Sequence, residues 1–263
     1  MTSAQQIPST VLAGGAELPM VGFGTWRLHG TGAYDSVRVA LDAGCRHIDT
    51  ASFYRNEAEV GRAIRDSGVP REDVFVTTKM WPDDAAGAFA ALDASLRRLR
   101  MEFVDLWLIH WPPGGSASPG VWAEFIAARS RGQARAVGVS NYDLAQIDEL
   151  TAATGVTPEV NQVPWSPSDH DPTFLDQLTK SEVIVEGYSP LKRTNLENPV
   201  LASIAQAHGV TAAQVVLRWH IEHGIVVIPK SATPSRIAAN VDLFRFTLAD
   251  DEIASIDALA RAR

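Results

Sequence analysis

Short apolar runs alternate along the chain with longer segments of mixed apolar and polar residues. The runs are rich in β-branched residues and lack strict polar alternation, which is typical of strands buried on both faces of a sheet. Their starts recur roughly every 25–30 residues, with one longer gap before the eighth, and this is the size of a strand–helix unit. The eight runs are residues 20–25, 45–49, 74–79, 104–110, 134–140, 159–163, 183–188 and 224–230.

The segments between the runs have the spacing of amphipathic helices. Residues 34–44 and 120–132 are two of them, and Gly44 stands where a glycine commonly ends a helix. Residues 85–100 form a third, with arginines in the last turn, where positive charge is favourable. The apolar face of this third segment consists of Phe89, Leu92, Leu96 and Leu99.

Eight strand–helix units in 263 residues predict an α/β fold, the (β/α)8 TIM barrel. We expect a single domain over residues 1–263. Residues 10–19 are expected to form an N-terminal β-hairpin around Gly14 and Gly15 that closes the bottom of the barrel. A doubly wound open sheet is the alternative. Such sheets usually carry G-x-G-x-x-G after the first strand, and the stretch GFGTWRL lacks the third glycine.

The composition and charge of the chain are those of a soluble protein that acts on small molecules. With 46% hydrophobic and 21% charged residues, the chain has the balance of a soluble globular protein. Its net charge of −8 disfavours nucleic acid and anionic membranes as partners. The single cysteine, Cys45, cannot form an internal disulfide. Because the sequence shows neither a signal-peptide pattern nor an apolar run of membrane-spanning length, we expect a cytoplasmic protein. We further expect a monomer whose partner is a small molecule.

Polar side chains follow seven of the eight apolar runs. In a barrel, the C-terminal ends of all strands open onto one face, and active sites are built there from several strands at once. A polar residue at one strand end would be an ordinary capping or loop residue. Polar residues at seven strand ends predict a functional site at this face. The residues concerned are Asp49, Lys79, His110, Ser140, Asn141, Gln162, Tyr188, Lys230 and Ser231.

Four residues at or near these strand ends form a coherent set for proton transfer. A nearby ammonium group stabilises a phenolate, so we expect Lys79 to lower the pKa of Tyr54. Asp49 would keep Lys79 charged and oriented, and His110 would donate a hydrogen bond to an electrophilic oxygen. The spacing alone leaves open a second interpretation, in which Asp49 and Lys79 form a structural ion pair under the barrel rim.

Residues 229–240 predict a site for an anion. Lys230 and Ser231 precede a short helix that begins at Thr233 and Pro234, and Arg236 lies in its first turns. A helix N-terminus surrounded by basic side chains favours phosphate, and barrels often bind phosphate after strands 7 and 8. An ordinary solvated turn is the alternative. A phosphate site together with a proton-transfer set indicates a phosphorylated cofactor or substrate.

Several motifs in register along nearly the whole chain resemble those of the aldo-keto reductase family. They are AGCRHIDTASFYRNEAEVG (43–61), VDLWLIHWP (104–112) and IPKSATPSRIAANVDLF (228–244), with GFGTW, GVSN, NQV and YSPL in the expected order. Within the family the chain resembles the short, prokaryote-like 2,5-diketo-D-gluconate reductases. The resemblance implies a (β/α)8 barrel that reduces aldehydes and ketones to alcohols with NADPH and without a metal.

The resemblance also implies roles for individual residues. Tyr54 would be the general acid, tuned by Lys79 and Asp49, and His110 would orient the carbonyl group. Ser140, Asn141 and Gln162 would hold the nicotinamide carboxamide, Tyr188 would stack on the ring, and Arg236 would suit a 2′-phosphate. The full set expected to bind NADPH is Thr25, Ser140, Asn141, Gln162, Tyr188, Ser189, Leu191, Lys230, Ser231, Arg236 and Asn240. The residues expected to line the substrate pocket are Trp26, Trp81 and Trp111.

The chain also departs from the family pattern. Pro164 and Ser166 stand where relatives often have Glu and His after NQV, and Ala239 stands where they often carry a glutamate that reaches the adenine. The loop after His110 is short, and the sequence lacks the long C-terminal tail of larger members. We therefore expect an open, apolar and permissive substrate pocket.

The sequence leaves two other functions open. His47 and Asp49 alternate on one strand, as metal ligands do in some barrel hydrolases, but the other strand ends carry few further ligands. A regulatory subunit that binds NADPH and turns over slowly would carry the same motifs as an enzyme. His220 and His223 lie three apart on a predicted helix without an H-E-x-x-H pattern, and we expect them to be solvated.

Overall fold

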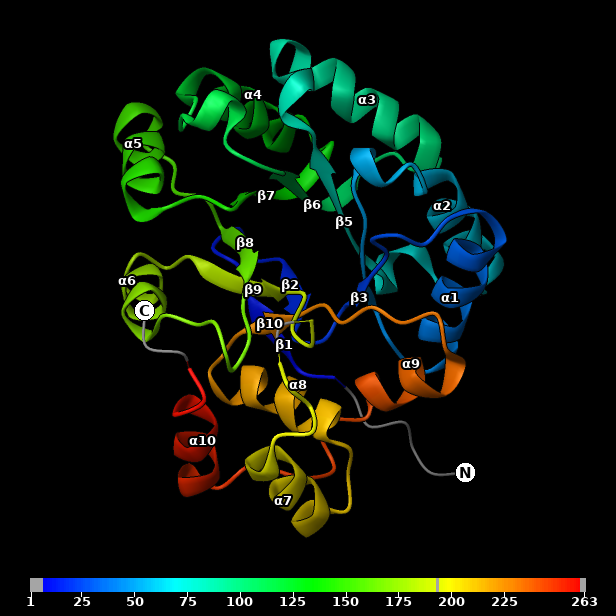
Figure 1. Ribbon diagram of the computed structural model, residues 1–263. Helices are drawn as coiled ribbons and strands as arrows, with labels where there is room; N and C mark the ends of the chain where they lie inside the picture. Colours follow the sequence, from blue (N-terminus) through cyan, green and yellow to red (C-terminus); the bar gives the residue numbers. More distant parts are fainter. Residues whose placement is uncertain (1–6, 193, 261–263) are drawn as a thin grey trace.

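Eight parallel strands stand at the centre of the computed structural model, which describes residues 7–192 and 194–260, and helices surround them (Figure 1). Each strand pairs with its neighbour in chain order, from β3 to β10. Every apolar run predicted from the sequence overlaps one of these strands. They are β3 (Phe23–Gly24), β4 (His47–Asp49), β5 (Phe75–Met80), β6 (Val104–Ile109), β7 (Ala134–Ser140), β8 (Val160–Pro164), β9 (Ile184–Tyr188) and β10 (Val226–Val227).

The first and last strands meet and close the sheet into a barrel. Val21 and Val227 form a parallel β-bridge. The amide of Gly22 donates to the carbonyl of Val227 over 2.8 Å, and the amide of Val227 donates to the carbonyl of Met20 over 3.0 Å. The predicted (β/α)8 barrel is therefore confirmed, and the alternative of an open doubly wound sheet is wrong.

The helices cover the outside of the barrel, as their apolar faces predict. Leu92, Leu96 and Leu99 are buried in α3, which starts at Ala88 because residues 82–87 form a 3-10 turn. Gly44 follows α1 with φ of +93°, a conformation that glycine adopts without strain. The helices are α1 (Gly30–Asp42), α2 (Glu57–Asp66), α3 (Ala88–Leu99), α4 (Pro119–Ser130), α5 (Leu144–Thr154), α6 (Pro172–Lys180), α7 (Pro199–His208), α8 (Ala212–Glu222), α9 (Pro234–Val241) and α10 (Asp250–Asp257).

The N-terminal hairpin closes the bottom of the barrel, as predicted. Its strands are β1 (Ser9–Val11) and β2 (Glu17–Pro19). Leu12 and Leu18 are buried in one cluster with side chains of the barrel strands. The carboxylate of Glu159 accepts a hydrogen bond from the amide of Gly14 over 2.7 Å and ties the hairpin to the barrel. This end of the barrel is consequently sealed.

One histidine prediction is wrong. His220, expected to be solvated, is fully buried where α8 packs against the barrel. Its ring nitrogens lie 2.8 Å from the carbonyl oxygen of Val216 and 3.1 Å from that of Trp165. Burial lowers its pKa to about 4, so the imidazole is neutral at pH 7. His223 is partly exposed and lies 2.9 Å from an Asp257 carboxylate oxygen.

Two further expectations concern the chain as a whole. The single domain over residues 1–263 stays a prediction, because its ends and Arg193 lie outside the described residues. In the described part of the chain, no single helix is long and apolar enough to cross a membrane. Helices α7 and α8 have the length and composition of a membrane span only when they are taken together, and the pair is bent by 89°.

Candidate active site

A cavity of about 680 Å³ opens at the C-terminal ends of the strands, opposite the hairpin. Side chains from the ends of most strands line it, as the polar strand ends predict. Of the residues predicted from the sequence, those on its wall are Trp26, Asp49, Tyr54, Trp81, His110, Trp111, Ser140, Asn141, Gln162, Tyr188, Ser189, Leu191 and Lys230.

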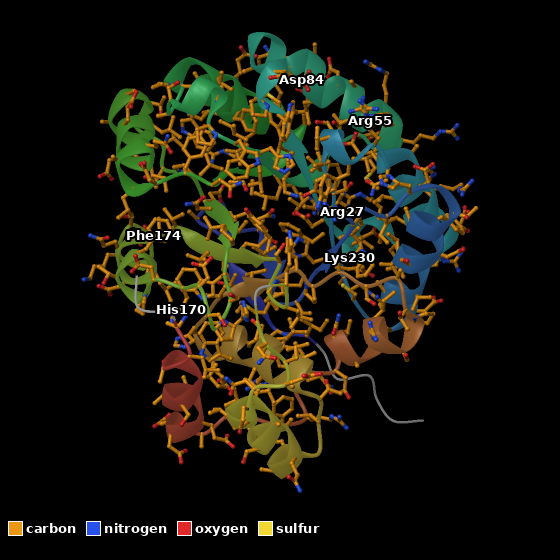
Figure 2. The ribbon with its side chains drawn as sticks, in the orientation of Figure 1. Arg27, Arg55, Asp84, His170, Phe174 and Lys230 are labelled. Carbon is orange, nitrogen blue, oxygen red and sulfur yellow. The ribbon has the colours of Figure 1, made fainter. Side chains whose placement is uncertain are left out.

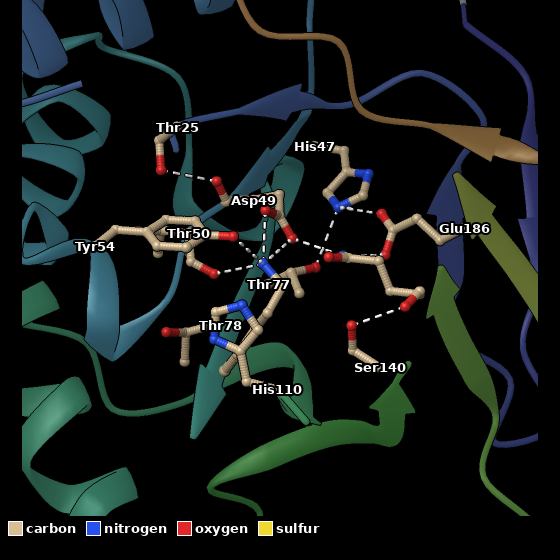
Figure 3. A network of polar contacts seen from close by, with 12 residues as sticks. Thr25, His47, Asp49, Thr50, Tyr54, Thr77, Thr78, His110, Ser140 and Glu186 are labelled. Carbon is tan, nitrogen blue, oxygen red and sulfur yellow. Dashed lines mark hydrogen bonds and ion pairs between the residues drawn. The ribbon is translucent and has the colours of Figure 1, made fainter. Parts of the chain in front are cut away.

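A buried ion pair lies at the floor of this cavity (Figure 3). The Lys79 Nζ lies 2.7 Å from each carboxylate oxygen of Asp49, and it also donates to the Thr50 carbonyl over 2.9 Å. The same Nζ lies 3.4 Å from the hydroxyl oxygen of Tyr54. Burial disfavours the ammonium, but the charge of Asp49, joined at high pH by that of the Tyr54 phenolate, raises the pKa of Lys79 above its ordinary value. Asp49 therefore holds a charged lysine behind Tyr54.

The local fold brings Tyr54 to this pair. It ends the short 3-10 helix η1 (Ser52–Tyr54) after β4, and Arg55 then adopts a left-handed backbone with φ of +56°. The side-chain amide of Asn56, which is fully buried, donates to the carbonyls of Thr25 and Leu28, each over 2.9 Å. Its oxygen accepts from the Thr50 hydroxyl over 2.7 Å. Asn56 thus joins the loops that follow β3 and β4.

The expected decrease in the pKa of Tyr54 is not what the structure shows. Burial raises the pKa of its hydroxyl to about 12, while the Lys79 charge lowers it and the Asp49 charge raises it. The side chain is only 8% exposed, so desolvation of the phenolate outweighs the attraction of the ammonium. Tyr54 is therefore a fully protonated group at neutral pH, with a cation in place to stabilise its phenolate.

His110 completes this part of the wall. Its ring packs edge-on against Tyr54, with centroids 5.6 Å apart. Burial, with a further contribution from the Lys79 charge, lowers its pKa to about 3. Among the described residues, its Nδ1 has no hydrogen-bond partner. A neutral imidazole thus lies beside the phenol, where it can donate one hydrogen bond without carrying charge.

Polar side chains from the ends of β7, β8 and β9 form a second group on the cavity wall. The hydroxyl of Ser140 donates to the backbone carbonyl of Gln162 over 2.7 Å. The amide nitrogen of Asn141 donates to Ser140 Oγ over 3.0 Å, and its oxygen accepts from the Tyr188 hydroxyl over 2.9 Å. Asn141 has a left-handed backbone, with φ of +64°, which turns the chain sharply after β7.

Basic side chains also line the cavity. Arg27 and Lys230 both lie on its wall, and Figure 2 labels both inside the ring of helices. Lys192 also lies on its wall. The remaining residues predicted to bind the cofactor do not line this cavity: Ser231, Arg236 and Asn240 lie beyond it, after β10 and in α9, and Thr25 lies behind it with its hydroxyl donating to the Asp49 carbonyl.

The outer wall is aromatic. The rings of Phe53 and Trp81 stack with centroids 4.0 Å apart, and Phe53 also stacks with Trp26 at 5.7 Å. Trp111 also lines the cavity and is 44% exposed. Exposed aromatic rings of this size, gathered at a cavity mouth, provide an apolar surface for a ligand.

Sequence reasoning missed Arg27 on the cavity wall and two further residues of this region. Phe53, directly before Tyr54, completes the aromatic wall between two tryptophans. Glu186, a fully buried carboxyl in β9, lies under the cavity and accepts a hydrogen bond from Gln162. An acidic residue inside an otherwise apolar strand was the available signal for Glu186, because buried carboxyl groups are rare without a partner.

Within residues 7–192 and 194–260, no group of three or more His, Cys, Asp or Glu side chains is placed to hold a metal ion. His47, the ligand that a hydrolase would need beside Asp49, instead lies 3.1 Å from the Thr77 hydroxyl. Burial lowers its pKa to about 3. The described residues therefore offer a proton-transfer set and no metal ligand set.

Comparison with known proteins agrees with this geometry. The model of the aldo/keto reductase family matches residues 20–261. Glyoxal reductase of Bacillus subtilis (strain 168) is 39% identical over 252 residues, which cover 94% of this chain and 91% of that protein. The structure of an aldo/keto reductase from Brucella melitensis is 41% identical with a TM-score of 0.93, covering 97% of this chain and 100% of that one. An aldo-keto reductase of Bombyx mori in complex with NADP is 32% identical with a TM-score of 0.91, covering 98% and 94%.

Proposed function

The chain belongs to the aldo-keto reductase family, and we propose that it is an NADPH-dependent reductase of aldehydes and ketones in which Tyr54 donates the proton. One observation carries the proposal: the Tyr54 hydroxyl lies on the cavity wall, 3.4 Å from a buried lysine ammonium. The neutral imidazole of His110 lies beside it. A proton donor, a charge that stabilises its conjugate base and a second hydrogen-bond donor are what carbonyl reduction requires.

The cavity has the donors and acceptors that a nicotinamide cofactor needs. The O–H of Ser140 and the N–H groups of Asn141 donate to protein oxygens and would have to turn toward the carboxamide oxygen, whereas the side-chain oxygen of Gln162 is an acceptor. With that exchange, this group can hold both ends of a carboxamide. Tyr188 would stack on the ring, with Ser189 and Leu191 beside it. Lys230, Ser231, Arg236 and Asn240 would hold the phosphates and the adenosine end, and the planar fork of Arg236 would suit the 2′-phosphate. When bound, the reduced nicotinamide supplies the hydride.

The residues of the chain then position the substrate and deliver a proton. The carbonyl oxygen would lie between the Tyr54 hydroxyl and the His110 ring, accepting a hydrogen bond from each. As negative charge develops on that oxygen, the hydroxyl of Tyr54 transfers its proton to it. Lys79 stabilises the phenolate that remains, and Asp49 keeps Lys79 in place. The raised pKa of Tyr54 ensures that the donor carries its proton at neutral pH.

The substrate class follows from the outer wall. Stacked aromatic rings favour apolar carbonyl compounds, and the cavity volume accommodates more than the smallest aldehydes. The relative from Bacillus subtilis is a glyoxal reductase, and a likeness to the 2,5-diketo-D-gluconate reductases stays a prediction from the sequence motifs. Dicarbonyl compounds and keto sugar acids therefore belong in the substrate panel. The cytoplasmic location and the monomeric state stay predictions.

A paired assay on the purified protein tests the proposal. Quenching of tryptophan fluorescence measures the affinity for NADPH and for NADH, and absorbance at 340 nm follows NADPH oxidation with a reactive aromatic aldehyde. We expect tight NADPH binding and turnover. Binding without turnover across the substrate panel would favour the regulatory subunit instead. Absence of NADPH binding would overturn the proposal as a whole.

A further inference from the structure

Glu186 is a buried acid that the proposed mechanism does not use. It lies in β9 opposite Gln162 of β8 in the strand register, and its side chain is fully buried beneath the cavity (Figure 3). Its Oε2 accepts a hydrogen bond from the side-chain nitrogen of Gln162 over 2.8 Å. The same nitrogen donates to an Asp49 carboxylate oxygen over 2.9 Å. Gln162 thus links Glu186 to the ion pair of Asp49 and Lys79.

These two contacts determine which way the amide of Gln162 points. A glutamine amide has two N–H donors at one atom and a carbonyl acceptor at the other. The Asp49 carboxylate can only accept, so the nitrogen faces it, and the second N–H of the same nitrogen is accepted by Glu186 Oε2. The carbonyl oxygen is then the polar atom that this side chain has left for a ligand in the cavity, which Gln162 lines.

Glu186 holds this arrangement without adding charge to the site. Burial, and next the charge of Asp49, raise the pKa of Glu186 to about 8, which favours the neutral acid. Its other oxygen lies 3.5 Å from His47 Nε2, and that imidazole is neutral as well. The charges of Asp49 and Lys79 therefore balance each other in the barrel interior, where an unpaired charge would be costly.

We propose that Glu186 is a positioning residue: it holds the Gln162 amide so that its oxygen accepts a hydrogen bond from the N–H group of the nicotinamide carboxamide. The inference rests on the proposed cofactor. Without an acceptor at position 186, one buried N–H of Gln162 has no partner, and the hydrogen bond to Asp49 alone holds the amide in its orientation. The cofactor would then lose a preorganised hydrogen bond, and no charge or covalent step would change.

Two variants separate this role from simple filling of the core. Glu186→Gln keeps an acceptor oxygen and a similar volume, and it mimics the neutral acid. Glu186→Met keeps the volume and removes the acceptor. Both are compared with the parent chain by circular dichroism and thermal unfolding before binding is measured.

The probes are NADP+ and its 3-acetylpyridine analogue, in which a methyl ketone replaces the carboxamide and removes the N–H donor. We expect Glu186→Met to bind NADP+ about fivefold to tenfold more weakly than the parent, the effect of one neutral hydrogen bond. Its affinity for the analogue should stay within about twofold of the parent's. Glu186→Gln should bind both ligands as the parent does, which is rescue by the conservative variant.

The outcomes separate the two proposals. Equal losses for both ligands in Glu186→Met, or no loss for either, would overturn the positioning role and leave the reductase intact. Weaker binding of NADP+ but not of the analogue by Glu186→Gln would also overturn the positioning role. If Glu186→Met does not fold, the affinities of Glu186→Gln decide whether Glu186 has this role. Failure of the parent to bind NADP+ would overturn the proposed function, and the role of Glu186 with it.

Discussion

The two ends of the barrel both bury carboxyl groups, but they treat them differently. At the bottom, Asp105 accepts from Arg71 over 2.7 Å, from Arg135 over 3.0 Å and from the amide of Val76 over 2.9 Å. Glu159 accepts from an arginine and from two backbone amides. Each carboxylate oxygen at this end has a partner. The bottom network therefore has the features of a structural element that ties the hairpin and the strand starts together.

At the opposite end, several buried side-chain polar atoms lack a hydrogen-bond partner among the described residues, including Ser52 Oγ and His110 Nδ1. The bottom has one such atom in its network, Arg71 Nε, but both oxygens of Asp105 and of Glu159 are paired there. The groups there also have displaced pKa values: that of Tyr54 rises to about 12 and that of His110 falls to about 3. Incomplete satisfaction of buried polar groups is destabilising, and proteins retain it where a ligand or a reaction needs it. The comparison indicates that buried polar groups stabilise the fold at the bottom of the barrel, whereas at the cavity end they are arranged for a ligand or a reaction.

The strongest test of this contrast is loss of the phenol at the cavity end. Tyr54→Phe should lower kcat/KM for aldehyde reduction by at least ~10²-fold, the usual effect of losing a general acid. NADPH binding, followed by tryptophan fluorescence, should be unchanged because the aromatic ring remains against Trp26. A variant that keeps its rate within a few-fold would exclude Tyr54 as the proton donor.

Removal of the ammonium behind Tyr54 should change the pH dependence as well as the rate. Lys79→Met should slow turnover by at least ~10-fold, because the phenolate loses its stabilising charge. Since the Lys79 charge opposes the effect of burial, its loss should raise the pKa of Tyr54 further.

The sign of that shift is best read in the oxidation of an alcohol by NADP+. This direction needs the phenolate as a base, so its rate rises with pH, and in Lys79→Met the rise should begin at a higher pH. Circular dichroism controls for folding, because the variant leaves Asp49 without its buried partner. A profile identical to that of the parent would make Lys79 a purely structural residue.

A more modest effect is expected outside the cavity, in α9. Arg236→Ala should weaken NADPH binding by about tenfold or more, because a charge-assisted hydrogen bond to the 2′-phosphate is lost. NADH lacks that phosphate, and its affinity should stay within about twofold. Fluorescence titration of both cofactors against the same variant gives the comparison. Equal losses would place the 2′-phosphate at another site.

The smallest effect on turnover is expected at the bottom of the barrel. Asp105→Asn should reduce the free energy of unfolding by about 1.5–3 kcal/mol, because hydrogen bonds to a charged acceptor are lost. Denaturant unfolding measures this change. The value of kcat/KM should stay within about twofold of the parent's, and a large loss of activity in folded protein would remove the distinction between the two ends.

Much of the fold and most of the proposed site could be predicted from the sequence. The eight apolar runs predicted eight strands because runs of β-branched residues without polar alternation are typical of strands buried on both faces. The polar residues after those runs had to share one face, since parallel strands of a barrel all end there. Asp49, Tyr54, Lys79 and His110 meet for this reason, although 61 positions separate the first from the last.

Only the tertiary structure decided how these groups behave. The pKa of Tyr54 depends on how completely the barrel removes water from its hydroxyl. Desolvation raises that pKa by more than the charge of Lys79, which the motif predicts, lowers it. The direction of the Gln162 amide depends on Asp49 and Glu186, which come from strands far apart in the chain. His220 is buried because α8 turns that face toward Trp165. Local pattern determines which elements form and where their ends point, whereas desolvation and contacts between distant residues arise only when the barrel closes.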